Sequence, residues 1–110
     1  MSHRFDVRLT SGAERDLAAI YAYLVAHAGA AVADTLLDEV TAQIETLEHF
    51  PERGAIPKEL QALGMTDFRQ TLCGPYRLIY RVLDTVVFVI VIADGRRDMG
   101  ALLQRRLLTR

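Results

Sequence analysis

The chain has 110 residues, of which 51% are hydrophobic and 25% are charged. This composition is typical of a folded protein and excludes an intrinsically disordered chain, and the length predicts a single domain over residues 1–110. The formal net charge of −1 disfavours a protein that holds nucleic acid through strong overall positive charge.

The charge is unevenly distributed along the chain. Residues 1–66 carry five basic and ten acidic side chains, a net charge of −5, whereas residues 67–110 carry eight arginines and four aspartates, a net charge of +4. Lys58 is the only lysine among the 13 basic residues. An acidic first part and a basic second part indicate a binding partner that the total charge conceals.

Cysteine content and hydropathy predict a cytoplasmic protein. Cys73 is the only cysteine, so no disulfide forms within the chain and a reducing compartment is the simplest expectation. The first eight residues carry charges and no apolar segment typical of a secretory signal. The longest apolar run, Val86–Ala93, is far shorter than the roughly 20 residues that span a bilayer, so no membrane association is expected.

The first predicted elements are a strand and a helix. Apolar and charged residues alternate over residues 5–9, which is the period of a strand with one buried face. Ser11 and Glu14 have the spacing of a capping box at a helix start. A 3.6-residue period then predicts an amphipathic helix over residues 12–28 that ends at Gly29. The apolar residues of this helix are Ala13, Leu17, Ile20, Tyr21 and Leu24.

A second helix follows almost without a linker. Its apolar residues also recur every three to four positions, and Pro51 ends it because proline lacks the backbone donor and disfavours helix in the residue before it. Two helices with so short a connection pack as an antiparallel hairpin, over about residues 12–50. The apolar stripe of the second helix consists of Val32, Leu36, Val40, Ile44 and Leu47.

Three strands and a last helix are predicted in the second half. Residues 51–67 contain two prolines and two glycines and indicate a loop, with one helical turn near residues 58–63. The last strand is apolar at every position, so we expect it to be covered on both faces. Asp98 caps a C-terminal helix over about residues 98–109. The strands are expected at residues 68–72, 76–83 and 86–93, a three-stranded segment of about residues 68–93.

The predicted order is therefore β-α-α-β-β-β, with an additional helix at the end. The fold class is α+β, a two-layer domain in which the helical hairpin lies on one face of an antiparallel-rich sheet. The other face requires a cover, and we expect the C-terminal helix, a partner chain or both to supply it.

No residue pattern of a common active site or cofactor site is present. The histidines His3, His27 and His49 lack metal-ligand spacing, and the isolated glycines do not form a phosphate-binding loop. Cys73 has no histidine near it in the sequence that would activate it as a nucleophile. We therefore expect neither a metal ion nor a cofactor.

The unusual feature of the sequence is the placement of arginine. Arg77 and Arg81 share one face of a predicted strand with Ile79, and two more arginines follow the next strand directly. Guanidinium groups bind phosphate and carboxylate groups through paired hydrogen bonds. We predict a surface that binds a target or an antagonist on the sheet face away from the hairpin; the alternative is a solvated strand face. The predicted surface consists of Arg69, Arg77, Ile79, Arg81, Arg96 and Arg97. Three further arginines, Arg105, Arg106 and Arg110, lie on the predicted last helix and are not part of this surface.

Two segments within this predicted order are distinctive. Residues 74–82 read GPYRLIYRV and residues 94–98 read DGRRD, on either side of the apolar strand. Together with the element order, they resemble the RelE/ParE superfamily, the toxins of bacterial type II toxin–antitoxin modules that are often described as plasmid stabilisation proteins. The resemblance covers nearly the whole chain.

Members of the RelE-like branch are endoribonucleases that cleave mRNA on the ribosome. The resemblance gives Arg77 and Arg97 the positions of two arginines that serve this reaction. The chain departs from that branch because residues 68–72 contain no lysine and residues 102–103 are leucines near the position of a C-terminal aromatic residue. Arg69 is a poor general base, since arginine keeps its proton at neutral pH. A ribonuclease is therefore the alternative function.

Members of the ParE-like branch instead inhibit DNA gyrase and trap it with cleaved DNA. The long hairpin, the YRLIY block and the lack of a lysine cluster resemble this branch, which implies a toxin that acts by binding. The resemblance also implies a cognate ParD-like antitoxin whose acidic tail folds on the basic face of the toxin. It further implies a toxin–antitoxin hetero-oligomer that contacts operator DNA only through the antitoxin. A second alternative is a non-toxic co-repressor that only binds its antitoxin.

Overall fold

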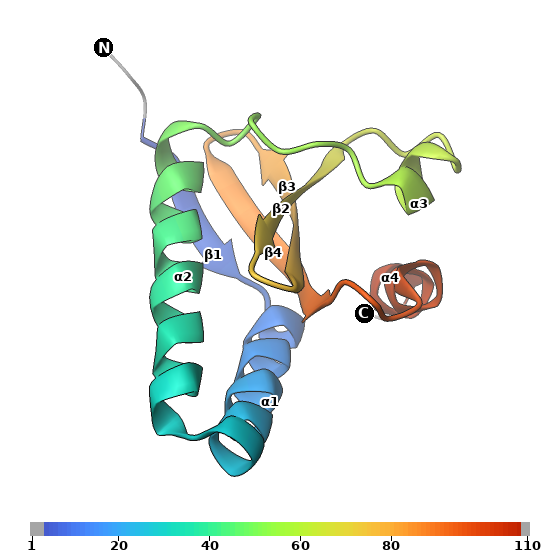
Figure 1. The fold of residues 1–110 in the computed structure, drawn as a ribbon. Helices are drawn as coiled ribbons and strands as arrows, with labels where there is room; N and C mark the ends of the chain where they lie inside the picture. Colours follow the sequence, from blue (N-terminus) through green and yellow to red (C-terminus); the bar gives the residue numbers. More distant parts are fainter. Residues whose placement is uncertain (1–3, 109–110) are drawn as a thin grey trace.

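The chain has the element order that the sequence predicts, as a computed structural model describes it for residues 4–108 (Figure 1). A helical hairpin precedes three of the four strands of one sheet, so the predicted α+β fold class is confirmed. His3, Arg110 and position 109 of the predicted last helix lie outside the described residues. The elements are β1 (Asp6–Leu9), α1 (Ser11–Ala28), α2 (Ala30–His49), α3 (Lys58–Gln61), β2 (Phe68–Cys73), β3 (Tyr76–Leu83), β4 (Val86–Asp94) and α4 (Met99–Leu108).

The sheet has the strand order β1-β4-β3-β2. β1 runs parallel to β4, and the other neighbouring strands are antiparallel. β4 therefore lies inside the sheet, where Val87, Val89 and Val91 are completely buried, as its unbroken apolar sequence predicts. The strands lie where they were expected, although β2 and β4 each continue one residue further, to Cys73 and Asp94.

The helices α1 and α2 cover one face of the sheet (Figure 1). Gly29 joins them with a φ of 98°, a left-handed conformation that is accessible to glycine without a steric penalty. Ala13 of α1 and Leu47 of α2 pack against Tyr80 in the centre of the sheet. No helix within residues 4–108 is long and apolar enough to cross a membrane.

The residue that caps α1 is Thr10, and the prediction of a capping box at Ser11 is wrong by one position. The Thr10 hydroxyl accepts a hydrogen bond from the Ala13 amide at 3.2 Å, and Ser11 is already the first helical residue. The reason lies in the sheet. The Thr10 amide donates to the Val89 carbonyl at 3.0 Å, which holds Thr10 in an extended conformation, so the helix begins after it.

The apolar stripe of α2 begins one residue later than predicted. Ala33 is completely buried, whereas Val32, which the sequence placed in the stripe, is 48% exposed. Ala33 lies in the first turn of α2, directly after the chain reverses at Gly29. Leu36, Val40 and Leu47 are buried as predicted.

The opposite face of the sheet is covered by α3 and α4, and so it is not open. Leu102 and Leu103 of α4 and Leu60 of α3 form one buried cluster with residues of the sheet. From the sequence, we expected this face to be covered by the C-terminal helix, a partner chain or both. In the structure, the C-terminal helix α4 covers it together with α3. The other residues of this cluster are Phe68, Ile79, Val91, Ala93 and Met99.

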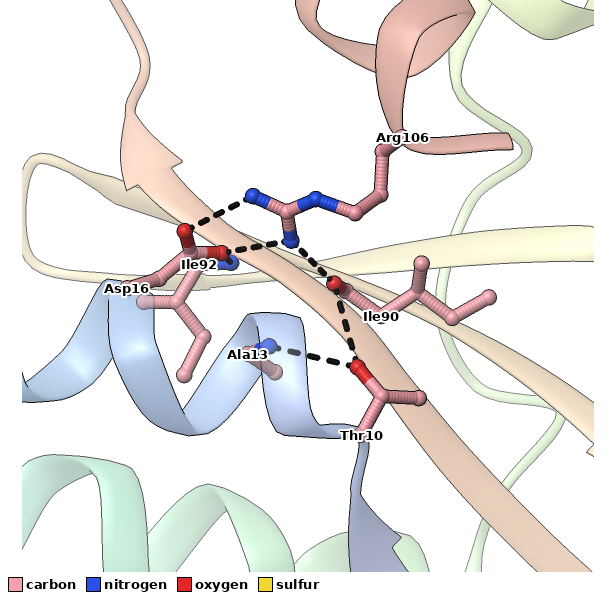
Figure 2. A network of polar contacts seen from close by, with 6 residues as sticks. All are labelled: Thr10, Ala13, Asp16, Ile90, Ile92 and Arg106. Carbon is pink, nitrogen blue, oxygen red and sulfur yellow. Dashed lines mark hydrogen bonds and ion pairs between the residues drawn. The ribbon is translucent and has the colours of Figure 1, made fainter. Parts of the chain in front are cut away.

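A polar network joins α4 to α1 along the edge of β4, beyond the end of β1 (Figure 2). β1 pairs with β4 only as far as Val89. After that point the Ile90 carbonyl accepts from Arg106 Nη1 at 2.7 Å, and the Ile92 amide donates to Asp16 Oδ2 at 3.0 Å. Arg106 also donates to both Asp16 oxygens, at 2.8 and 3.0 Å. The hydrogen bonds to Asp16 raise the pKa of Arg106. The bonds to Ile90 and Ile92 satisfy backbone groups of β4 beyond the reach of β1.

Gly12 provides the space that this network needs. A Cβ atom at Gly12 would lie 2.9 Å from Arg106 Nη1 and 3.2 Å from Arg106 Cδ, and contacts this short force the guanidinium to move. The first turn of α1 therefore has to be small where the side chain of Arg106 crosses it.

We predict that Arg106→Ala lowers the free energy of unfolding by about 2–3 kcal/mol, because it leaves the Ile90 carbonyl with only the longer 3.5 Å hydrogen bond from the Thr10 hydroxyl and Asp16 without its counter-charge. The matched control is Arg105→Ala, which removes the neighbouring exposed arginine and should change stability by less than about 0.5 kcal/mol. Urea unfolding at pH 7 measures both values. Equal effects of the two substitutions would contradict a structural role of the network.

Candidate functional site

The predicted arginine surface is not a single open face. Arg69 lies on the hairpin side of the sheet, because its partner in the ladder is Tyr80, which packs against the hairpin. Arg69 Nη1 donates to the Gly54 carbonyl at 2.8 Å and so supports the loop before α3. The expectation that Arg69 lies on the same face of the sheet as Arg77 is wrong. Successive residues of a strand point to opposite faces of the sheet, and the register of β2 against β3 decides which face Arg69 takes.

Arg77 is held within the fold by an acidic residue that the sequence did not connect with it. Its guanidinium donates to both carboxylate oxygens of Glu59 at 2.8 and 2.9 Å, and its Nε donates to Gln70 at 2.8 Å. The side chain is only 11% exposed. Hydrogen bonds from Arg77 lower the pKa of Glu59 to about 2. Arg77 therefore fixes α3 to the sheet, and its charge is already matched.

Ile79 and Arg81 lie further along β3. Ile79 is completely buried in the cluster beneath α4, so it does not form part of the surface. Arg81 Nε lies 3.2 Å from Asp67 Oδ2, and its guanidinium carbon lies 5.5 Å from the centre of the Phe68 ring. Arg81 is thus far along the strand from Arg77 and binds its own partners.

Arg96 and Arg97 are the predicted site residues that face solvent. They lie in the turn between β4 and α4, and the Arg96 side chain is 90% exposed while it pairs with Asp94 at 2.9 Å. Hydrogen bonds from the Arg96 side chain lower the pKa of Asp94 to about 2. Arg97 is exposed and forms no ion pair with the residues at 4–108. These two guanidinium groups are available to a partner.

Beside these two arginines lies a groove of about 420 Å³ between α1 and the end of the sheet, which we call the α1–sheet groove. Tyr23 stands at its rim with 60% of its surface exposed, stacked on His27 at 4.1 Å between ring centres. Tyr76 lies opposite, and its partial burial raises the pKa of its hydroxyl. Tyr23 is not among the predicted site residues; its signal in the sequence is an aromatic residue outside the apolar stripe of α1. The groove is lined by Asp16, Ala19, Ile20, Tyr23, Tyr76, Ile92, Ala93, Asp94, Arg96 and Arg97.

The nucleophile and metal ligands considered in the sequence do not form a reactive centre in the described part of the chain. Cys73 is buried, and desolvation together with Glu39 raises the pKa of its thiol to about 11, which keeps it protonated. Within residues 4–108, no three His, Cys, Asp or Glu side chains are placed to hold a metal ion. The arrangement is suited to binding acidic groups beside an apolar surface.

We predict that Glu59→Gln lowers the free energy of unfolding by about 1–2 kcal/mol at pH 7, because it weakens a charge-assisted pair with Arg77. A folded-state pKa of about 2 lies below the usual value of Glu, so this contribution is complete above about pH 5 and is lost as the pH falls toward 2. Wild type should therefore lose more stability than Glu59→Gln between pH 6 and pH 2.5.

The matched control for this prediction is Glu52→Gln, at an exposed glutamate in the loop before α3. It should unfold like wild type at both pH values, as measured by urea titration. A Glu59→Gln variant with the wild-type pH dependence would show that the ion pair contributes little to stability.

Comparison with known proteins places this geometry in a family. The family model of the ParE toxin of type II toxin–antitoxin systems, parDE, matches residues 7–99. The chain is similar to a solved structure described as the chromosomal ParDE system from P. aeruginosa, with 24% identity, coverage of 84% of this chain and 98% of that one, and a TM-score of 0.69. It is also similar to a chain of the toxin–antitoxin complex RelBE2 from Mycobacterium tuberculosis, with 22% identity, coverage of 83% and 98%, and a TM-score of 0.55.

No curated protein sequence matches the chain significantly. The structural matches share the fold, and the family model extends from β1 to the start of α4. The predicted RelE/ParE resemblance is therefore confirmed, and within it the chain belongs to the ParE toxin family of type II toxin–antitoxin systems.

Proposed function

We propose that this ParE-type toxin inhibits DNA gyrase by binding to it and that a cognate antitoxin with an acidic tail neutralises it. The observation that supports binding over RNA cleavage is the ion pair of Arg77 with Glu59. Cleavage requires a group that stabilises the negative charge developing on the phosphate. A guanidinium that already donates two hydrogen bonds to a carboxylate and one to the Gln70 side chain is poorly suited to that role.

The ribonuclease alternative draws support from the fold shared with the RelBE2 structure. Of the two arginines that the RelE-like pattern uses, Arg97 remains exposed while Arg77 is held by Glu59 and Gln70. β2 contains no lysine, and its Arg69 is bonded to the Gly54 carbonyl. The residues at the RelE-like positions therefore offer no general base, and the gyrase proposal is preferred.

An antitoxin partner is supported by the descriptions of both similar structures, which name a toxin–antitoxin system and a toxin–antitoxin complex. The exposed Arg96 and Arg97 beside the α1–sheet groove match the acidic tail that the family resemblance implies. In this proposal the toxin and the antitoxin form a hetero-oligomer in the bacterial cytoplasm, where gyrase acts, and operator DNA is contacted through the antitoxin.

We predict that expression of the chain without its antitoxin activates a DNA-damage reporter and increases gyrase-linked DNA breaks, because the toxin would stabilise gyrase on cleaved DNA. The breaks are measured by recovering DNA that is covalently attached to gyrase. An empty vector and co-expression with the gene encoded beside the toxin are the controls, and co-expression should restore the basal signal.

The alternatives give different results in the same experiment. A ribonuclease would cleave mRNA in a cell-free translation system without inducing DNA damage, and Arg97→Ala would abolish cleavage without disturbing the fold, since this side chain is exposed. A non-toxic co-repressor would leave growth, DNA and mRNA unchanged. Either pattern would overturn the gyrase proposal.

A further inference from the structure

A second hollow lies between α1 and α4, and the proposed function gives it no role. It measures about 480 Å³, a volume in the range of small-molecule binding sites. Its two sides come from opposite ends of the chain, because the start of α1 forms one and α4 forms the other. α1 contributes Ser11, Gly12 and Arg15, and α4 contributes Leu102, Arg105 and Arg106.

The hollow carries unmatched positive charge. Three arginines line it, and no acidic side chain does. Arg106 is bound to Asp16, which lies outside the lining, so its charge is matched. Arg15 and Arg105 are exposed, and neither forms an ion pair with any residue at positions 4–108. Two guanidinium groups are therefore free to bind an anion in this hollow.

The two free arginines are held in place through their neighbours in the chain. Arg15 directly precedes Asp16, and Arg105 directly precedes Arg106. Asp16 and Arg106 are joined by hydrogen bonds of 2.8 and 3.0 Å (Figure 2). This pair fixes the backbone of α1 relative to that of α4 at the hollow. A ligand that binds both free arginines then has to order only their side chains, which lowers the entropy cost of binding.

The other polar groups at the start of α1 are also hydrogen-bond donors. The Ser11 side chain is exposed, and its hydroxyl group lines the hollow. The first amides of an α-helix have no acceptor within the helix, and those of Ser11 and Gly12 lie at the start of α1. Guanidinium, hydroxyl and amide groups together require a ligand with several acceptor oxygens and a negative charge.

Phosphate meets this requirement better than a carboxylate does. A phosphate group offers more oxygens than the two of a carboxylate, so it can accept hydrogen bonds from both helices and from a hydroxyl at the same time. Arginine binds it through paired hydrogen bonds. The apolar side chains of Ile90 and Leu102 also line the hollow, and they provide a surface for the uncharged part of a phosphate ester.

We propose that the hollow between α1 and α4 binds a phosphate group, which is held by Arg15, Arg105 and the Ser11 hydroxyl. Two sources share this chemistry, a free nucleotide and the backbone of a nucleic acid. The site shares no lining residue with the α1–sheet groove, and it does not depend on the gyrase or the antitoxin proposal.

The test removes the two free charges from the purified full-length toxin. Arg15→Gln with Arg105→Gln changes the hollow, and Ser11→Ala removes the hydroxyl. Arg8→Gln with Arg53→Gln is the matched control, because it removes two exposed arginines that do not line the hollow. Circular dichroism and urea unfolding establish that each variant is folded.

The probes are inorganic phosphate, adenosine 5′-monophosphate and a DNA duplex. The first two are titrated into ¹⁵N-labelled toxin and followed by NMR, and the duplex is followed by fluorescence anisotropy. We expect saturable shifts of the Ser11 and Gly12 amide signals with phosphate. The double arginine variant should bind at least about tenfold more weakly than wild type, Ser11→Ala about threefold more weakly, and the control within about twofold of wild type.

The probes distinguish the two sources of phosphate. Binding of the nucleotide without the duplex would support the site and identify a free nucleotide as its ligand. Binding of the duplex, weakened by the double arginine variant and not by the control, would support the site and identify a nucleic-acid backbone.

Three results would overturn the inference. The first is the absence of a saturable shift at the start of α1 in wild type with either phosphate probe. The second is equal affinity of the double arginine variant and the control. The third is equally strong binding of N-acetylaspartate at the same signals, which would show a site for carboxylates such as those of an acidic peptide.

Discussion

The fold depends on how the edge of β4 is satisfied where β1 ends. A strand inside a sheet requires partners on both sides, yet β1 pairs with only the first four residues of β4. Asp16 and Arg106 replace the missing strand by bonding the Ile92 amide and the Ile90 carbonyl. Because these side chains come from α1 and α4, the same bonds fix a helix from each end of the chain to the sheet.

This constraint also determines where the arginines meet solvent. One hollow, between α1 and the end of the sheet, has Arg96 and Arg97 in its lining, and a second, between α1 and α4, has Arg15, Arg105 and Arg106. The sheet face beneath α4 is filled by apolar side chains instead. The basic character noticed in the second half of the sequence is therefore displayed at the border between two helices and the sheet, and not across the strands themselves.

The sequence predicts the local structure well and the pairing of distant residues poorly. β3 lies at residues 76–83 as expected, because alternation within a strand is a local property. The partner of Arg77 is Glu59, 18 positions earlier, and only the placement of α3 against the sheet brings them together. The face on which Arg69 lies depends on the register of β2 against β3. The position of the α1 cap depends on a hydrogen bond from the Thr10 amide to β4. Each of these errors concerns a long-range contact that periodicity does not encode.

The position of α4 has a consequence for the solubility of shorter forms of the chain. A protein that ended after β4 would lose Met99, Leu102 and Leu103 from one buried cluster and Arg106 from the Ile90 carbonyl. It would then present an apolar sheet face next to an incompletely paired strand, the combination through which sheets of different molecules associate. The last helix thus also shields this apolar face, and we expect shortening of the chain within α4 to favour aggregation.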